Sequence, residues 1–337
     1  YEINVFQKAA AVLSWDKETY MPPNGLAARI QQMTTLSQLS HRFFTSAEFG
    51  DALANAEAEL NGTPYESDKA SLIRLLKKQY DDATKLPDDM VKEMSEVAGQ
   101  AHAVWQKARQ ENDFAAFQPW LAKNVAFDQE KARLYGYDDE PYDALLDKYE
   151  AGMKTADVRA IFDACKAALV PLLQQIAERA DSVSDTLVHQ KFPIDQQKTF
   201  ARYIAKAIGY DFSRGHLGTV VHPFATSFSR DDARITTRWN DGFLNPALFG
   251  TLHECGHAMY EQGTGESLAR TPLARGTSLG IHESQSRMME NLVGRSRGFW
   301  QTHFPKLQEI FPEQLGEATA EAFYRAINKV HPSYIRV

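Results

Sequence analysis

The chain has 337 residues, of which 43% are hydrophobic, and a formal net charge of −7. This length can bury a substantial core, and the scattered basic residues argue against nucleic acid or an anionic membrane surface as the partner. No apolar run reaches the ~18 residues of a membrane span, and no signal peptide is recognised. Cys165 and Cys255 lie far apart in the sequence, so we expect a protein of the reducing cytoplasm.

The hydrophobic period is helical over most of the chain. Pro87 to Arg109 is predicted to be a helix with one buried stripe, because its apolar side chains recur every three or four residues. The same spacing predicts a second such helix over 156–179, with a buried stripe formed by Val158, Ile161, Cys165, Leu169, Leu172 and Ile176. Further helices are predicted at 28–45, 66–84, 113–135 and 196–208. We therefore expect a mainly α protein with one domain over residues 1–337.

One segment departs from the helical pattern. Val220 to Asn240 is rich in Val, Phe, Thr and Ile, and its residues 233–239 partly alternate between apolar and polar side chains. The turn-like stretch Ser229 to Asp232 divides it. We predict a small antiparallel hairpin or sheet here.

Residues 253–257 read His-Glu-Cys-Gly-His, and chance gives about 0.02 matches to H-E-x-x-H in a chain of this size. On a helix, His253 and His257 share a face, so both imidazoles can reach one metal ion. Glu254 then lies beside that ion, where it can take a proton from metal-bound water. Cys255 points to another side of the helix and is expected to be a packing residue.

The surrounding residues predict the helix that this chemistry requires. Asn245 is a good N-cap, Pro246 is a good first helical residue and Gly263 is a good helix stop. Gly256 inside the helix costs roughly 1 kcal/mol relative to alanine. Its presence predicts a close backbone approach at the site.

A zinc ion held by two histidines needs a third protein ligand. The predicted helix from Leu279 to Asn291 offers Glu283, which we favour, with His282 and Glu290 as competitors. His282 and Glu283 project about 100° apart, so only one of them should face the metal. We expect His282 and Gln285 to orient the metal ligands through hydrogen bonds without binding the metal themselves.

Several motifs then occur in an order typical of one family. They are Leu13 to Pro23, His222-Pro-Phe224, Asp232 to Thr237, His253 to His257, His282-Glu-Ser-Gln285 and Pro332 to Val337. With these motifs the whole chain resembles the M32 family of metallocarboxypeptidases, the thermostable carboxypeptidase Taq type.

The resemblance implies a large helical gluzincin-type scaffold with a deep active-site groove and a small antiparallel sheet beside the zinc helix. It implies Glu283 as the third ligand of Zn²⁺, with Co²⁺ or Mn²⁺ as alternatives. It also implies a homodimer that removes single residues from the C-termini of peptides with broad preference.

The resemblance also supplies candidates for substrate binding. Arg336 lies in the family's Ile-Arg motif, and an arginine suits the terminal carboxylate of a peptide. His222 either contacts substrate or caps a turn. Asp232 and Arg234 either form an ion pair that fixes the sheet beside zinc or contact substrate directly.

The sequence departs from the family in two places. Ala233 stands where Pro or Val is usual, and the sequence ends at Val337, whereas the family continues with several helices and a late Gly-x-x-Gln-Asp-x-His-Trp motif. We therefore expect a peptidase domain that lacks this C-terminal segment. The alternatives are an endo-oligopeptidase on the same scaffold and a non-catalytic zinc-containing peptide-binding protein, against which the intact Glu254 argues.

Overall fold

The structure is a computed structural model that describes residues 2–331. The chain forms two compact units. The first unit runs to Thr155 and also contains Phe228–Arg230 and Thr264–Ser278, and the second contains the rest of the described chain. The single domain over 1–337 stays a prediction, and Arg336 with its whole motif, Pro332 to Val337, lies outside the described residues.

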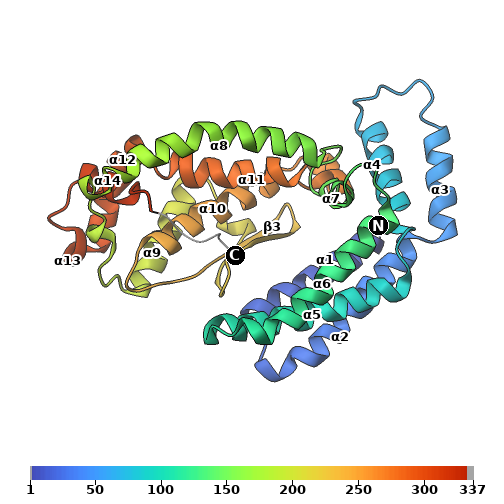
Figure 1. The fold of residues 1–337 in the computed structure, drawn as a ribbon, viewed down its shortest axis with the longest axis horizontal. Coiled ribbons are helices and arrows are strands. Elements are labelled where there is room, and N and C mark those ends of the chain that lie inside the picture. The colour runs from blue at the N-terminus through green and yellow to red at the C-terminus, as the bar shows by residue number, and fades with distance from the viewer. Residues whose placement is uncertain (1, 332–337) are drawn as a thin grey trace. The chain divides into compact units, whose positions relative to one another are not determined.

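The first unit is helical (Figure 1). Its α-helices are α1 (Glu2–Thr19), α2 (Leu26–Phe44), α3 (Ala47–Ala58), α4 (Asp68–Ala83), α5 (Asp88–Glu111), α6 (Phe114–Tyr135) and α7 (Pro141–Leu146). Side chains just before three of them accept a hydrogen bond from a backbone N–H of the first turn: Ser46 for α3, Ser67 for α4 and Asp113 for α6. The helices predicted at 28–45, 66–84 and 113–135 are confirmed to within two residues.

Helix α5 packs against α2 and α6 and confirms the predicted apolar stripe. Val97 and Ala101 are buried, and Met90, Met94 and Val104 are partly buried. Two aromatic residues of the motif Leu13 to Pro23 differ in burial: Trp15 on α1 is buried, whereas Tyr20 is exposed.

The second unit holds the remaining α-helices and the sheet, apart from the end of β2, which belongs to the first unit. Its elements are α8 (Thr155–Ala177), α9 (Ile194–Ala207), β1 (Leu217–Thr219), β2 (Ala225–Ser229), β3 (Asp232–Thr237), α10 (Asn245–Gln262), α11 (Leu279–Arg287), a π-helical turn (Met288–Val293), α12 (Arg297–Ile310), α13 (Pro312–Leu315) and α14 (Ala320–Ile327). One aromatic core joins α9, α10, α12 and α14. It contains Phe192, Phe200, Phe249, Trp300, Phe304, Phe311 and Phe323. This core holds one end of α10 rigidly.

Helix α8 is confirmed, but its predicted buried stripe is wrong. None of its residues is buried, and Ile161, Leu169 and Leu172 are 56%, 47% and 50% exposed. A window of α8 has a mean hydropathy of 1.3, so by length and composition alone it could cross a membrane, contrary to our expectation. Core helices of globular proteins meet the same test, so this does not by itself identify a span.

The predicted sheet is present and has three strands in the order β1–β3–β2. β1 lies wholly before the predicted segment and pairs with β3 in parallel, with Leu217 opposite Ile235, so the sheet is not wholly antiparallel as expected. Ala233 and Ile235 of β3 pack against Cys255 and Ala258 of α10. The sheet therefore lies beside the helix that carries the H-E-x-x-H motif.

Candidate metal centre

Helix α10 begins within one residue of the predicted start and ends at Gly263 as predicted. Pro246 lies in its first turn, although Leu244 and not Asn245 is the residue that precedes the helix. Hydrogen bonds link both ends of α10 to neighbouring segments of the second unit. Thr237 Oγ1 donates to Ala247 O at 3.2 Å, and the buried Gln262 donates to Asp211 O at 3.0 Å. The helix is therefore fixed along its whole length.

At Gly256 the backbone of α11 comes close to α10. A Cβ atom added there would lie 2.5 Å from Gln285 O and 2.5 Å from Ser286 Cα. These atoms belong to the backbone of α11 and cannot move aside without moving that helix. The close approach predicted from Gly256 is confirmed, and it brings the two motif-bearing helices together.

The three predicted metal ligands meet across this contact. One donor atom from each of His253, His257 and Glu283 lies within 4.8 Å of the others. Glu283 Oε2 is 3.2 Å from His257 Nε2 and 3.6 Å from His253 Nε2. Ligand bonds of about 2.1 Å in a tetrahedron separate neighbouring donor atoms by about 3.4 Å. The donor set and these two spacings thus fit one tetrahedral metal ion.

The protonation of these side chains also suits metal binding. Burial, together with the neighbouring His282 and His253, lowers the pKa of His257 to about 4. Burial acts to raise the pKa of Glu283, but His253 and Arg287 lower it overall. At neutral pH the site therefore presents a neutral imidazole and a carboxylate, which are the forms that bind a metal.

The Nδ1 atom of each ligand histidine contacts a further side chain, Glu290 for His253 and His282 for His257. Glu290, buried in the π-helical turn, lies with Oε2 2.8 Å from His253 Nδ1. His282 Nδ1 lies 2.6 Å from His257 Nδ1, so His282 stands behind a ligand and does not compete with Glu283. The orienting role expected of His282 stays a prediction. Glu290, considered as a ligand from sequence, instead contacts a ligand.

Glu261 is the residue of this cluster that sequence reasoning missed. Its Oε1 lies 2.9 Å from His282 Nε2. It follows His257 by four residues on α10, the same spacing that joins the two histidines. That spacing is the signal that could have placed it on the metal-facing side of the helix.

Glu254 and Cys255 lie between the two ligand histidines in the sequence of α10, and both are buried. Glu254 is 4% exposed and follows His253 directly, so it is buried at the site. Cys255 is buried in the contact between α10 and β3, where burial raises the pKa of its thiol. Its predicted role as a packing residue is confirmed.

The structure describes three of the four residues proposed for substrate contact, namely His222, Asp232 and Arg234. Asp232 and Arg234 form a two-point ion pair on β3, with N–O distances of 2.7 and 2.8 Å. His222 is exposed in the bend between β1 and β2. Gln285 donates to Ser284 Oγ at 3.2 Å, and within the described chain no hydrogen bond joins its side chain to the metal ligands, so it does not support them as expected.

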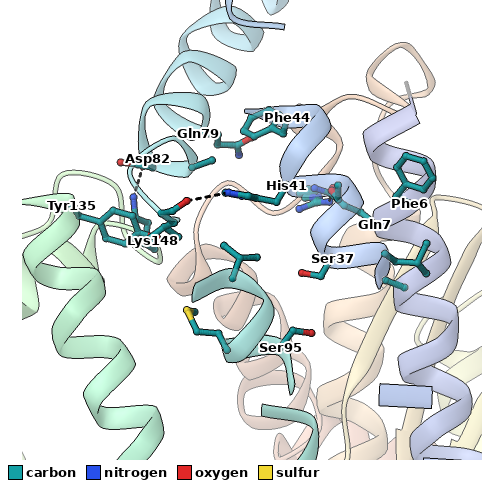
Figure 2. A pocket seen from close by; sticks show the side chains of 18 residues that line it. Phe6, Gln7, Ser37, His41, Phe44, Gln79, Asp82, Ser95, Tyr135 and Lys148 are labelled. Carbon is teal, nitrogen blue, oxygen red and sulfur yellow. Dashed lines mark hydrogen bonds and ion pairs between the residues drawn. The ribbon is translucent and has the colours of Figure 1, made fainter. Parts of the chain in front are cut away.

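A cavity of about 790 Å³ lies in the first unit, whereas the three metal donors belong to the second (Figure 2). Its polar lining is largely engaged: Lys148 pairs with Asp82, His41 Nε2 lies 3.1 Å from Leu86 O, and Arg275 donates to Gln7 at 2.7 Å. It contains none of the three clustered metal donors. Size alone therefore does not make it the active site.

Comparison with known proteins identifies the family. The family model described as Carboxypeptidase Taq (M32) metallopeptidase matches residues 1–337. Carboxypeptidase 1 of Bacillus subtilis (strain 168) is 36% identical over 335 residues, which cover 99% of this chain and 66% of that protein. Thermostable carboxypeptidase 1 of Thermus thermophilus is 38% identical over 339 residues, covering 97% of this chain and 66% of that protein.

Solved structures agree with the sequence matches. The structure of Pyrococcus furiosus carboxypeptidase has a TM-score of 0.88 at 35% identity, covering 98% of this chain and 66% of that one. The M32 carboxypeptidase of Deinococcus radiodurans R1 has a TM-score of 0.85 at the same identity and coverage. The chain thus spans 66% of the length of the relatives it matches. With the family's sequence pattern over its full length and the family's fold, the chain belongs to the carboxypeptidase Taq (M32) metallopeptidases.

Proposed function

We propose that this chain is a zinc-dependent carboxypeptidase that releases single amino acids from peptide C-termini with broad specificity. The observation that carries the proposal is the convergence of His253, His257 and Glu283 within 4.8 Å, together with the buried Glu254, which follows His253 in the chain. Two imidazoles and one carboxylate around an open position are the ligand set of a catalytic zinc site. The carboxypeptidase names of relatives at 36–38% identity support the substrate class.

The residues have separate roles in this reaction. His253, His257 and Glu283 would hold the ion, which when bound lowers the pKa of a water toward about 7 and polarises the scissile carbonyl. Glu254 takes the proton of the attacking water and passes it to the departing amine. Burial of Glu254 keeps competing water away from that transfer.

Selection of a C-terminal residue requires recognition of the free carboxylate. An arginine does this with two parallel hydrogen bonds, and Arg336 remains our candidate. The guanidinium of Arg234 already donates to the carboxylate of Asp232 at 2.7 Å. This pairing supports a role in fixing β3 beside α10 over direct contact with substrate. His222 is exposed and stays a candidate contact.

The decisive experiment compares a blocked dipeptide with its C-terminal amide, with and without a chelator. We expect the chain with zinc to release the free C-terminal residue, and amidation or chelation to abolish release. Glu254→Gln should lower the rate by about 10²–10⁴-fold while metal content stays unchanged. Glu321→Gln is the matched control, because Glu321 pairs with Arg297 on α14 and α12, outside the metal cluster.

The other outcomes separate the alternatives. Equal cleavage of the amide would contradict an exopeptidase and indicate an endo-oligopeptidase. Stoichiometric zinc without cleavage of either peptide would contradict catalysis by this chain and leave a non-catalytic peptide-binding protein.

Metal identity, assembly and compartment are part of the same proposal. Zn²⁺ suits the two-nitrogen, one-oxygen donor set, and reconstitution with Zn²⁺, Co²⁺ or Mn²⁺ ranks the three ions by activity. We propose peptide substrates, a homodimer and no nucleic-acid or membrane partner, which sedimentation and binding assays can test. Cysteines without a disulfide, one buried and one exposed, support the reducing cytoplasm as the compartment.

A further inference from the structure

We propose that two carboxylates outside the metal ligand set, Glu290 and Glu261, are positioning residues that fix which nitrogen of each ligand histidine faces the ion. Glu290 acts on His253 directly, whereas Glu261 acts on His257 through His282. The inference rests on the proposed metal site and adds residues to it. Each step follows from hydrogen-bond direction.

The first step concerns His253. Its Nε2 faces Glu283 Oε2 at 3.6 Å, and its Nδ1 lies 2.8 Å from Glu290 Oε2. A carboxylate accepts hydrogen bonds and does not donate them, so the proton of the neutral ring must lie on Nδ1. The lone pair is then on Nε2, on the side where Glu283 lies.

The position of Glu290 depends on a local change in the helix. α11 ends at Arg287, and Met288–Val293 continues it as a π-helical turn, where the chain has more residues per turn. Arg287 bonds Glu283 Oε1 at 2.8 Å and Glu290 Oε2 at 3.2 Å. One guanidinium thus holds a metal ligand and the partner of another ligand in a fixed relation.

The second step concerns His257, and here an imidazole lies between the ligand and the carboxylate. Glu261 Oε1 accepts from His282, so the proton of the neutral His282 ring lies on Nε2. His282 Nδ1 is then an acceptor, 2.6 Å from His257 Nδ1, which must donate. His257 therefore also keeps its proton on Nδ1 and presents the lone pair of Nε2 toward Glu283, 3.2 Å away.

The two supports differ in a way that can be measured. His253 donates to the charged carboxylate of Glu290. His257 donates to the neutral imidazole of His282, whose orientation depends on Glu261. Loss of the partner of a ligating histidine typically weakens metal binding about 10–100-fold. We expect the larger loss from removing Glu290 and the smaller loss from removing Glu261.

The test measures the zinc dissociation constant by competition with a chelator, using the full chain. Glu290→Leu and His282→Phe should weaken binding about 10–100-fold, and Glu261→Leu by about tenfold. Glu290→Gln and Glu261→Gln should recover most of the affinity, because the amide oxygen still accepts the same hydrogen bond. Glu321→Gln, which removes an arginine-paired carboxylate elsewhere, should leave the affinity unchanged.

A spectroscopic readout separates positioning from simple structural support. In ¹⁵N-labelled protein, His253 and His257 should carry their proton on Nδ1 and His282 on Nε2. Glu261→Leu should redistribute the tautomers of His282 and His257 and leave His253 as in the wild type. A zinc-binding wild type whose affinity and tautomers do not change in these variants would overturn the inference alone, whereas a wild type that binds no zinc would overturn the proposed function with it.

Discussion

Helices α8 and α10 of the second unit have opposite relations between composition and burial. α8 has 23 residues, long apolar side chains and no buried residue. α10 has 18 residues, of which 12 are buried, and these include His253, Glu254 and Gln262. The more apolar helix is exposed, and the helix with charged and polar groups is inside. Burial is decided by what packs against a helix, which composition does not specify.

The difference has an identifiable cause in the neighbours of α10. β3 covers one side of α10, α11 approaches another at Gly256, and the aromatic core holds a third. Two of the polar side chains buried there, His253 and Gln262, have hydrogen-bond partners, whereas the side-chain oxygen of Asn245 is buried without one. The burial of His253 and Gln262 therefore carries little of the penalty that an unpaired polar group would have.

The largest effect should come from removing a ligand that α10 presents. His257→Ala leaves one histidine and Glu283, so zinc affinity should fall well beyond the roughly 10–100-fold expected for an outer partner. Chelator competition measures this. Retained affinity would show that the buried polar side of α10 does not serve a metal.

A leucine on each helix tests the comparison directly. Leu252 on α10 is fully buried, whereas Leu169 on α8 is 47% exposed. Leu252→Ala should lower the free energy of unfolding by about 2–5 kcal/mol, and Leu169→Ala by less than about 0.5 kcal/mol. Urea denaturation gives both values. Equal losses would mean that α8 is covered in solution.

Glycine substitutions test the contact that brings the ligands together. Gly256→Ala would place a methyl group against the backbone of α11, so we expect a loss of about 1–3 kcal/mol in stability together with weaker zinc binding. Gly298→Ala on α12 is the control, because no atom lies within 4 Å of the added Cβ there. That change should be neutral or stabilise by up to about 1 kcal/mol. A neutral Gly256→Ala would contradict the close approach.

The smallest expected effect concerns a charge cluster far from the metal. Asp185 lies 2.9 Å from Lys329 Nζ and 2.9 Å from His331 Nε2, and these contacts lower its pKa to about 2. Because the pKa is lowered in the folded state, this stabilisation is present above pH 4 and is lost as pH falls toward 2. Asp185→Asn should cost about 1 kcal/mol at neutral pH, since solvent screens the pairs.

The pH dependence checks the sign of that effect. The difference in stability between wild type and Asp185→Asn, measured by urea denaturation, should shrink as pH falls from 4 to 2. Asp195→Asn, which removes an exposed carboxylate paired with Lys198, is the control and should show little change at any pH. A difference that grows on acidification would contradict the assignment.

Local signals predicted much of the site. The four-residue spacing of His253 and His257 put them on one face, Gly256 signalled a close approach, and Glu283 was the favoured third ligand. Glu290 follows Glu283 by seven residues and was considered, but as a ligand. The π-helical turn that sets its position behind His253 has no sequence pattern that we recognised.

The sequence by itself determined the helical period, the metal-ligand spacing and, through its motifs, the family. These features depend on neighbours within a few residues along the chain, so they can be read locally. Only the tertiary structure decided which apolar faces are buried, that β1 pairs in parallel with β3, and which carboxylates stand behind the ligand histidines. Those features depend on contacts between segments that lie far apart in sequence, where the local period carries no information about the partner.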